Sequence, residues 1–329
     1  MNRFLLVFVP PAVLTLAAAL GGWAELLPLL VLFVAVPALD QVVPLDHDNA
    51  PGARWLRALP FAFVPAHLAA LAYALTRIAS GELATVEQIG LVIGAGITTA
   101  TAINVAHELM HRAGRVEQAL SAVIMATATY THFCVEHVQG HHKHVGTPRD
   151  PATSRDGESL YAFLPRSLVG GLRSAWAIEA ARSGVGTRNR LLRYALAQVG
   201  LIAGIAAVWG GVGVAAFLGQ SAIAVVMLET INYIEHYGLV RAETAPGRYE
   251  RVLPRHSWNS SHRVSNAMLL NLARHSDHHA FAARAFPDLR HYDDVPQLPG
   301  GYSAMLMLAT VPPLWFRVMA PRVAGARGV

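Results

Sequence analysis

The chain has 329 residues, of which 53% are hydrophobic and only 14% are charged, against about 25% charged residues in soluble proteins. This composition is that of an integral membrane protein, so we predict one membrane-embedded domain over residues 1–329 and no separate soluble domain. The formal net charge of +5 is spread over scattered Arg residues, which indicates membrane topology and a docking surface and excludes nucleic-acid binding.

Six apolar segments are predicted to cross the membrane as helices. A signal peptide is the competing interpretation of the first segment, but no small-residue cleavage site leads into a polar region, and a second apolar segment follows at once. The predicted fold is therefore all-α, with about six transmembrane helices. The segments are 4–20, 23–39, 58–79, 88–111, 192–209 and 212–236.

The distribution of basic residues predicts how these helices are oriented. The linkers 21–22, 80–87 and 210–211 contain no Lys or Arg, and of the 26 Lys and Arg residues only Arg77 falls on the outward half. Because cytoplasmic loops carry the excess of Lys and Arg, we place both termini in the cytoplasm. The segments 107–190 and 236–300 lie on the same side and form a helical cap.

Two further apolar stretches complicate this topology. Residues 118–135 are long enough to suggest a span, but a single crossing would separate the histidines at 107–111 from those at 137–142. We therefore expect 118–135 to stay on the cytoplasmic side, packed under the spans. Residues 302–320 contain Pro312-Pro313 and are predicted to be interfacial or re-entrant.

Histidines recur at helical spacing after these spans. His107 and His111 are separated by four residues, so both rings lie on one helical face. The sequence HELMH also resembles the HExxH pattern of zinc proteases, with Glu108 as the base. His137 and His141 again share a face, whereas His142 points about 140° away from His137 on an ideal helix. Either His142 serves a second metal, or Gly140 distorts the turn.

The segment RHSDHH at 274–279 is the third cluster, and on a helix His278 and His279 lie about 60° and 40° to either side of His275. His236, at the end of the sixth span, lies at the same expected depth as His107. A catalytic zinc uses three protein ligands and a structural zinc four, so nine imidazoles predict two metal ions in the cytoplasmic cap. Imidazole binds Zn, Cu, Fe or Ni, and so leaves the element open.

Four acids and seven further histidines are not expected to bind the metal directly. Four acids adjoin the candidate ligands and either accept the distal N–H of a ligating ring or are solvated acids and partners of Arg112 and Arg274: Glu108, Glu136, Glu235 and Asp277. Seven histidines are interpreted as hydrogen-bonding or surface residues, with His132 and His262 as the first candidates for exception: His47, His67, His132, His144, His256, His262 and His291.

These motifs together carry a family resemblance. The HxxxH, HxxxHH and HxxHH boxes after spans resemble the membrane-bound di-iron hydroxylases and desaturases. NYIEHYGL at 232–239, HSWNS at 256–260 and RHSDHHA at 274–280 are similar to bacterial alkane 1-monooxygenases. The similarity runs from Ala106 to Leu298 and includes DPATSRDGESLY at 150–161. It departs from the family at Arg112, where Lys is common, and at Arg255, where His is common.

The resemblance implies a di-iron centre that activates O2 to hydroxylate the terminal carbon of medium- or long-chain n-alkanes drawn from the bilayer. It implies electrons from reduced rubredoxin, supplied by a rubredoxin reductase, and no haem or flavin in this chain. Cys134, the single cysteine, independently excludes a Cys-based iron–sulfur or rubredoxin-type centre in the chain. The expected location is the bacterial inner membrane, with the iron site on the cytoplasmic side. The implied ligands are His107, His111, His137, His141, His142, His236, His275, His278 and His279.

Other functions remain open at this point. A related methyl-group monooxygenase acting on xylene or cymene, or a hydroxylase of fatty acyl chains, would differ in the residues that line the spans. Acyl desaturation is disfavoured by NYIEHYGL. A membrane metal transporter or storage protein would place its ligands near the middle of the membrane, whereas these histidines are predicted to gather at one end of the helices.

Overall fold

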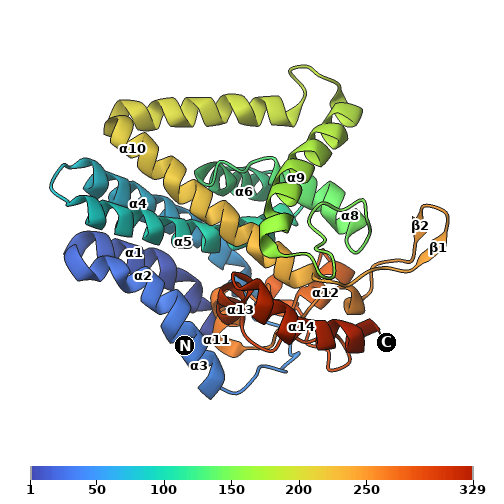
Figure 1. Ribbon diagram of the computed structural model, residues 1–329. Coiled ribbons are helices and arrows are strands. Elements are labelled where there is room, and N and C mark those ends of the chain that lie inside the picture. Colours follow the sequence, from blue (N-terminus) through green and yellow to red (C-terminus); the bar gives the residue numbers. More distant parts are fainter. Residues whose placement is uncertain (1, 328–329) are drawn as a thin grey trace.

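The computed structural model describes residues 2–327, which are folded almost wholly into helices (Figure 1). Among these residues, five helices are long and apolar enough to cross a membrane. They are η1 (Arg3–Phe8) with α1 (Val9–Leu20); η2 (Gly22–Leu26), α2 (Leu27–Leu30), η3 (Val31–Ala35) and α3 (Val36–Val42); η4 (Arg54–Ala58) with α4 (Leu59–Ala79); α5 (Thr85–Met110); and α10 (Arg190–His236).

Shorter elements fill the loops and the C-terminal third of the chain. The two strands β1 (Glu243–Ala245) and β2 (Arg248–Tyr249) pair antiparallel as a small protruding hairpin. The helical elements are α6 (Arg115–Thr127), α7 (Phe133–Glu136), η5 (His137–His141), α8 (His142–His144), α9 (Leu160–Ser183), η6 (Pro254–His256), α11 (Arg263–Met268), α12 (His275–Ala280), η7 (Phe286–Asp288), α13 (Tyr302–Ala309) and α14 (Pro312–Arg327).

Helix α10 contains both the fifth and the sixth expected span. Its 47 residues are interrupted at Gly210, whose φ of 65° and ψ of −165° are not helical. This region of backbone conformation is essentially restricted to glycine, so the Gly210-Gly211 pair turns the chain sharply. The break, the α1–η2 turn and the α4–α5 turn all lie at the same end of the molecule (Figure 1).

Helix α5 is the central helix of the bundle and contacts α1, α2, α4, α6 and α10. Its many small residues explain this close packing. A Cβ on Gly96 would lie 2.6 Å from the Cβ of Ile223 on α10, a separation that real side chains do not reach. Small residues let helices approach closely when apolar lipid provides little driving force for association.

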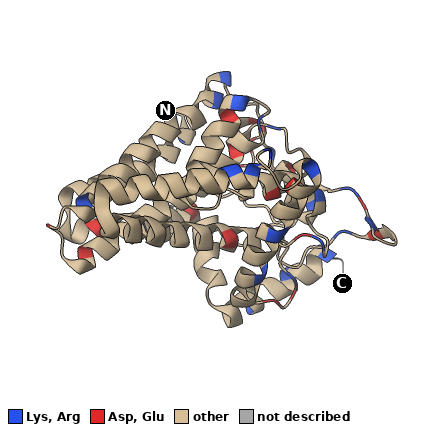
Figure 2. Cartoon of the chain, turned by 90° about the horizontal axis from the view of Figure 1, so that it is seen from above, with Lys and Arg blue, Asp and Glu red and all other residues tan. Residues whose placement is uncertain are grey.

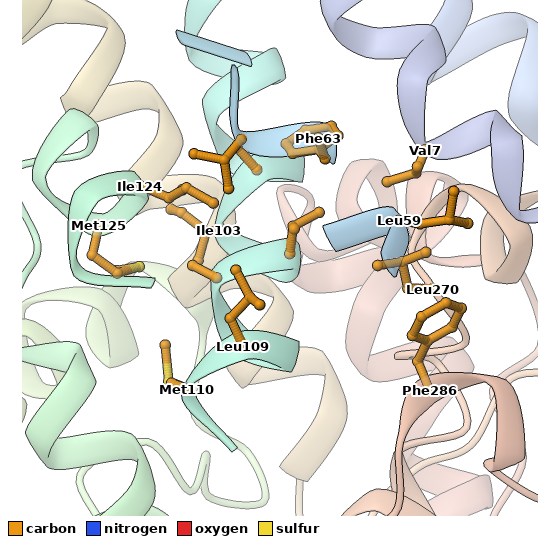
Figure 3. Close-up of a cluster of buried hydrophobic side chains, with 14 of the residues drawn as sticks. Val7, Leu59, Phe63, Ile103, Leu109, Met110, Ile124, Met125, Leu270 and Phe286 are labelled. Carbon is orange, nitrogen blue, oxygen red and sulfur yellow. The ribbon is translucent and has the colours of Figure 1, made fainter. Parts of the chain in front are cut away.

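A buried apolar cluster joins the N-terminal helices to the C-terminal part of the chain (Figure 3). Val7, Leu59 and Ile103 from three of the long helices pack in it with Ile124 of α6. Phe286, far along the chain, packs edge-to-face on Phe4 with ring centroids 5.0 Å apart. The cluster therefore holds the segment after α12 against the ends of the membrane helices.

Residues 118–135 form a re-entrant hairpin rather than a layer under the spans. Helix α6 packs along α5, and its last residue, Thr127, accepts hydrogen bonds on its carbonyl from Gln220 Nε2 (2.6 Å) and Ser221 Oγ (3.0 Å) of α10. These bonds satisfy backbone groups at the hairpin tip, which non-helical backbone inside a membrane bundle requires. The chain turns at Thr129, with φ of 52°, and returns through α7 to the end of α5. The hairpin starts and finishes at the same end of the bundle. The histidines at 107–111 and at 137–142 can therefore share one site.

The basic residues are unevenly distributed along the molecule. Lys and Arg gather at the end that holds the C-terminus, opposite the end formed by the three turns (Figure 2). At the turn end, Arg77 pairs with Glu82 (Nη1–Oε2, 2.7 Å). In the 302–320 stretch, α13 and α14 are two separate helices, and neither is among the five long apolar helices of the described residues.

Candidate metal centre

The end of α5 supplies the first pair of histidines. His107 lies in the last turn of α5 and His111 directly follows it, so the four-residue spacing keeps both rings on one side. Nε2 of His111 lies 3.2 Å from Nε2 of His137. The ring of His107 packs against the same neighbour, with ring centroids 4.6 Å apart. The first predicted pair therefore faces the second cluster.

A π-turn determines the position of His142. Residues His137–His141 form η5, a π-turn in which the backbone N–H of His142 donates to the carbonyl of His137. Because a π-turn has more residues per turn than an α-helix, the fifth residue along returns to the starting side, and His142 Nε2 lies 3.1 Å from His137 Nε2. A side chain on Gly140 would collide with the Glu136 carboxylate. The distortion around Gly140, one of the two explanations left open, is therefore present.

Helix α12 and the end of α10 supply the remaining rings. Nε2 of His275 lies 3.2 Å from Nε2 of His236, and Nε2 of His278 lies 3.1 Å from Nε2 of His142. His279 packs between these pairs, with its ring stacked on that of His142 at a centroid distance of 4.3 Å. All the residues of α12 except Ala280 are buried.

Arg274 fixes α12 in place. Its guanidinium is almost wholly buried and forms an ion pair with Asp46 (Nη2–Oδ2, 2.8 Å). It also donates to the carbonyls of Asp48 (2.9 Å) and Leu289 (2.6 Å). A buried guanidinium is stable only when it is paired and hydrogen-bonded in this way. The loop after α3 therefore positions the third histidine cluster.

The nine histidines fall into two groups, in each of which the candidate ligand atoms lie within 4.8 Å of one another. Ligand atoms about 2.1 Å from one ion and about 90° to 109° apart lie about 3.0 to 3.4 Å from each other. The four Nε2–Nε2 separations of 3.1 to 3.2 Å lie in this range. The groups are His107, His111, His137, His142 and His278, and His141, His236, His275 and His279.

Unpartnered nitrogens support the same fit. Nε2 of His107, of His141 and of His279 is buried and has no hydrogen-bond partner among residues 2–327. Each such atom costs about 1–3 kcal/mol unless something binds it. Imidazole nitrogens that converge in this way fit transition-metal ions, one in each group.

The electrostatics of the site favour neutral rings. Burial, followed by the neighbouring imidazoles, lowers the pKa of His111 to about 4. The same two causes hold the pKa of five more rings well below the ordinary value: His137, His142, His275, His278 and His279. A neutral imidazole keeps the nitrogen lone pair that a metal requires.

Asp150 makes His141 the exception. Its Oδ2 lies 2.9 Å from Nδ1 of His141, and Thr153 Oγ1 donates to the same oxygen at 2.6 Å. Although burial opposes the charged form, this carboxylate raises the pKa of His141 above its ordinary value. An Nδ1–H donated to Asp150 leaves Nε2 directed into the second group. Asp150 was not among the predicted site residues, since it stands outside every histidine box.

The four predicted acids have different surroundings. Glu235 accepts from Tyr302 Oη (2.7 Å) on Oε1, and its Oε2 lies 3.2 Å from Nε2 of His275. Glu136 accepts from Ser174 (3.2 Å). Among the described residues, no hydrogen bond joins Glu136, Glu108 or Asp277 to a histidine ring. Glu108 pairs with Arg112 and the backbone N–H of Phe286, and Asp277 accepts from Arg284, Tyr292 and the backbone N–H of Arg290.

A largely apolar cavity ends on both histidine groups. His107 and His137 of the five-membered group line it together with His275 of the four-membered group. Its other walls come mainly from apolar side chains of η3, α5, α10 and α13, including Leu32, Ile103, Met227 and Leu306. The site can therefore hold an apolar molecule against the rings.

The other histidines serve elsewhere. His67 lies within hydrogen-bond distance of Thr127 (3.1 Å) and His262 of Ser260 (3.0 Å). His291 stacks on His47 at a centroid distance of 4.1 Å. These two and Asp293 form a further small group that the sequence did not predict; His291 contacts Ser261 (2.6 Å) and Asp293 (3.0 Å) through its two nitrogens.

Comparison with known proteins identifies the class of molecule that this fold and site define. Residues 84–308 match the family model described as fatty acid desaturase. The match runs from the start of α5 into α13 and includes all nine histidines of the two groups. The protein is thus a membrane enzyme of the desaturase class.

Individual relatives show which family within this class the chain is similar to. The chain is 41% identical over 316 residues to alkane 1-monooxygenase 2 of Pseudomonas aeruginosa, covering 89% of this chain and 82% of the relative. It is 39% identical over 320 residues to the alkane 1-monooxygenase of Acinetobacter baylyi, covering 93% and 77%. The hydroxylase component of the xylene/toluene monooxygenase of Pseudomonas putida is 29% identical over 223 residues, covering 66% and 58%. The chain belongs to the alkane 1-monooxygenase family, as the histidine boxes and NYIEHYGL predicted, and it is a monooxygenase.

Proposed function

We propose that this protein hydroxylates the terminal methyl group of medium- or long-chain n-alkanes. The reaction is R–CH3 + O2 + 2 e⁻ + 2 H⁺ → R–CH2OH + H2O. The observation that carries the proposal is the largely apolar cavity that ends on His107, His137 and His275, so that one molecule inside it reaches both histidine groups. Family membership supplies the reaction class.

The nine histidines are proposed to hold two iron ions, five rings at one and four at the other. The separations of 3.1 to 3.2 Å between Nε2 atoms support this assignment. Iron supplies the activation of O2, which no side chain of the chain can perform. The protein contributes neutral rings, and Asp150 fixes the tautomer of His141. Glu235 faces Nε2 of His275, which is the nitrogen proposed to bind the metal, and not the distal N–H of that ring.

The substrate is proposed to enter from the bilayer. An alkane partitions into lipid, and the cavity is bounded by membrane helices such as α5 and α10, whose outer faces are apolar. Leu32, Met227 and Leu306 offer an alkyl chain contacts but no hydrogen bonds. The alkane can therefore be held with one methyl group against the histidines, while the rest of its carbon chain extends between the helices.

Electrons are proposed to come from rubredoxin and its reductase. The single cysteine, Cys134, is buried, so no iron–sulfur centre of this chain can supply them. A groove is lined by Arg255, Arg322 and Trp258, together with the single acid Asp294, at the end of the molecule where basic residues gather (Figure 2). Trp258 reaches from this groove to the site, because its backbone N–H donates to the Glu235 carbonyl (2.9 Å). A basic groove favours an acidic partner.

The proposed location is the bacterial inner membrane, with the iron site and both termini in the cytoplasm. The lack of Lys and Arg in the linkers 21–22, 80–87 and 210–211 supports this orientation. Rubredoxin, which is water-soluble, would then approach from the side where the basic groove lies.

The direct test is conversion of a substrate panel by whole cells that co-express a rubredoxin and its reductase. We expect n-alkanes to give 1-alkanols, with p-xylene and fatty acids converted at least tenfold more slowly. His236→Ala should abolish conversion, since it removes a ring from the four-membered group. If p-xylene were converted faster than the n-alkanes, the protein would instead be assigned as a xylene monooxygenase, the activity named for the relative at 29% identity. Metal binding without any conversion would contradict the enzymatic proposal.

A further inference from the structure

Asn104 is an anomaly in the wall of the substrate cavity. It lies on α5, three residues before His107, and is only 6% exposed. Its side chain lines the cavity, yet its amide nitrogen, Nδ2, has no hydrogen-bond partner among the described residues. A buried amide without a partner is destabilising, so a group that occupies the cavity is the natural partner.

Three neighbouring polar side chains of the cavity differ from Asn104 in this respect. Thr101 donates to the carbonyl of Thr98 in its own helix (2.7 Å). Asn232 donates to Glu229 (3.3 Å), and Tyr302 donates to Glu235 (2.7 Å). Each of these side chains donates a hydrogen bond to another group of the protein, whereas the Asn104 amide nitrogen has no such acceptor among the described residues.

The shape and chemistry of the cavity select the ligand. An alkane offers Asn104 no hydrogen bond. A single water molecule needs two to four polar partners, and the walls near Asn104 are apolar, as Ala100, Ile103 and Leu228 show. A carboxylate would find its cation at the metal held by the histidines and not at Asn104, because no Lys or Arg is among the described residues that line the cavity. A primary alcohol fits, because its hydroxyl both donates and accepts, as an amide does, and its alkyl chain fills the apolar remainder.

We propose that Asn104 forms a binding site for the hydroxyl group of a primary alkanol whose chain occupies the cavity. This inference rests on the proposed function, in which such an alcohol is the product. Asn104 would then hold the product oxygen beside the histidine groups, and a 1-alkanol would compete with an alkane for the cavity.

The test measures binding without turnover. The purified metal-loaded protein in lipid nanodiscs is titrated with radiolabelled 1-octanol and with n-octane, in the absence of reductant. We expect Asn104→Leu, which keeps the branched shape and the number of heavy atoms and removes the amide, to weaken 1-octanol binding about five- to tenfold, as the loss of one hydrogen bond does. Binding of n-octane should change less than about twofold. Thr98→Val is the control, since Thr98 lies on the same helix but outside the residues that line the cavity and its hydroxyl donates to the Gly94 carbonyl (2.9 Å), and it should leave both affinities unchanged.

A second measurement covers the case in which Asn104→Leu does not fold. Wild-type protein should bind 1-octanol more tightly than 1-fluorooctane, which has the same length but whose fluorine is a much weaker acceptor for the Asn104 amide N–H, once each is corrected for partition into lipid. Equal binding of these two ligands, or unchanged 1-octanol binding by a folded Asn104→Leu variant, would overturn the proposal. Because no electrons are supplied, binding that depends on Asn104 would stand even if the substrate panel yielded no alkanol, so the two proposals fail separately.

Discussion

Asp150 illustrates how a residue outside the histidine boxes controls the site. Its two oxygens are fully used: Oδ1 accepts from the backbone N–H of Ala152 (3.0 Å), and Oδ2 contacts Thr153 (2.6 Å) and His141 (2.9 Å). Burial opposes its ionisation, but facing His141 lowers the pKa of Asp150 below its ordinary value. The carboxylate is therefore charged and holds the ring of His141 in one orientation and one tautomer.

Replacing Asp150 by Asn should weaken metal binding while the protein stays folded. The amide keeps the size of the side chain but removes the charge that fixes the His141 tautomer, and comparable changes lower metal affinity about 10- to 100-fold. The measurement is metal retention against increasing chelator. Thr153→Val is the control and should have a smaller effect, since Thr153 contacts Asp150 and not the ring. Identical retention by Asp150→Asn and wild type would remove Asp150 from the site.

Sequence spacing predicted much of the site at this scale, but only where helices are regular. His107 and His111 follow the four-residue period, and the structure places them in one group. His142 does not follow it, since the π-turn at His137–His141 changes the period locally. The sequence offered a distortion at Gly140 only as one of two explanations. Asp150 and Asn104 also escaped prediction. Their importance comes from what they contact, or fail to contact, across the fold.

At the scale of helices, the break in α10 returns the chain to the histidine site. The second half of α10 runs from Gly210 back to His236. The angle at this break therefore determines where His236 lies. Pairs of glycines and apolar run lengths predicted the turn. Sequence could not show that the re-entrant hairpin at 118–135 inserts as far as Gln220, because its apolar composition suits a span, a surface layer or a hairpin equally.

Two neighbouring glycines allow a sharp test of this break. Gly210→Ala should destabilise the protein by about 1–3 kcal/mol, because a φ of 65° with a ψ of −165° strains any residue that has a Cβ. Gly211→Ala should be neutral or slightly stabilising, because nothing lies within 4 Å of its added Cβ and alanine favours helix. The measurement is the midpoint of thermal unfolding in detergent. Equal shifts for the two variants would contradict a break specific to Gly210.

At the scale of the whole molecule, the two ends of the helix bundle differ in charge. Three turns with few basic residues form one end, and the histidine groups and most of the Lys and Arg form the other (Figures 1 and 2). Apolar substrate and a polar electron donor can therefore reach the same site from different sides. Charge distribution predicted this polarity because it depends on where residues lie along the chain. The division of nine histidines into five and four depends on the fold and was not predictable ring by ring.

The proposed chemistry requires that these histidines hold two iron ions. The most direct measurement is the iron content per chain of purified, folded, active protein, determined by elemental analysis together with protein quantification. We predict two iron ions per chain in the wild type. A folded and active sample with one iron ion per chain, or with none, would contradict the claim.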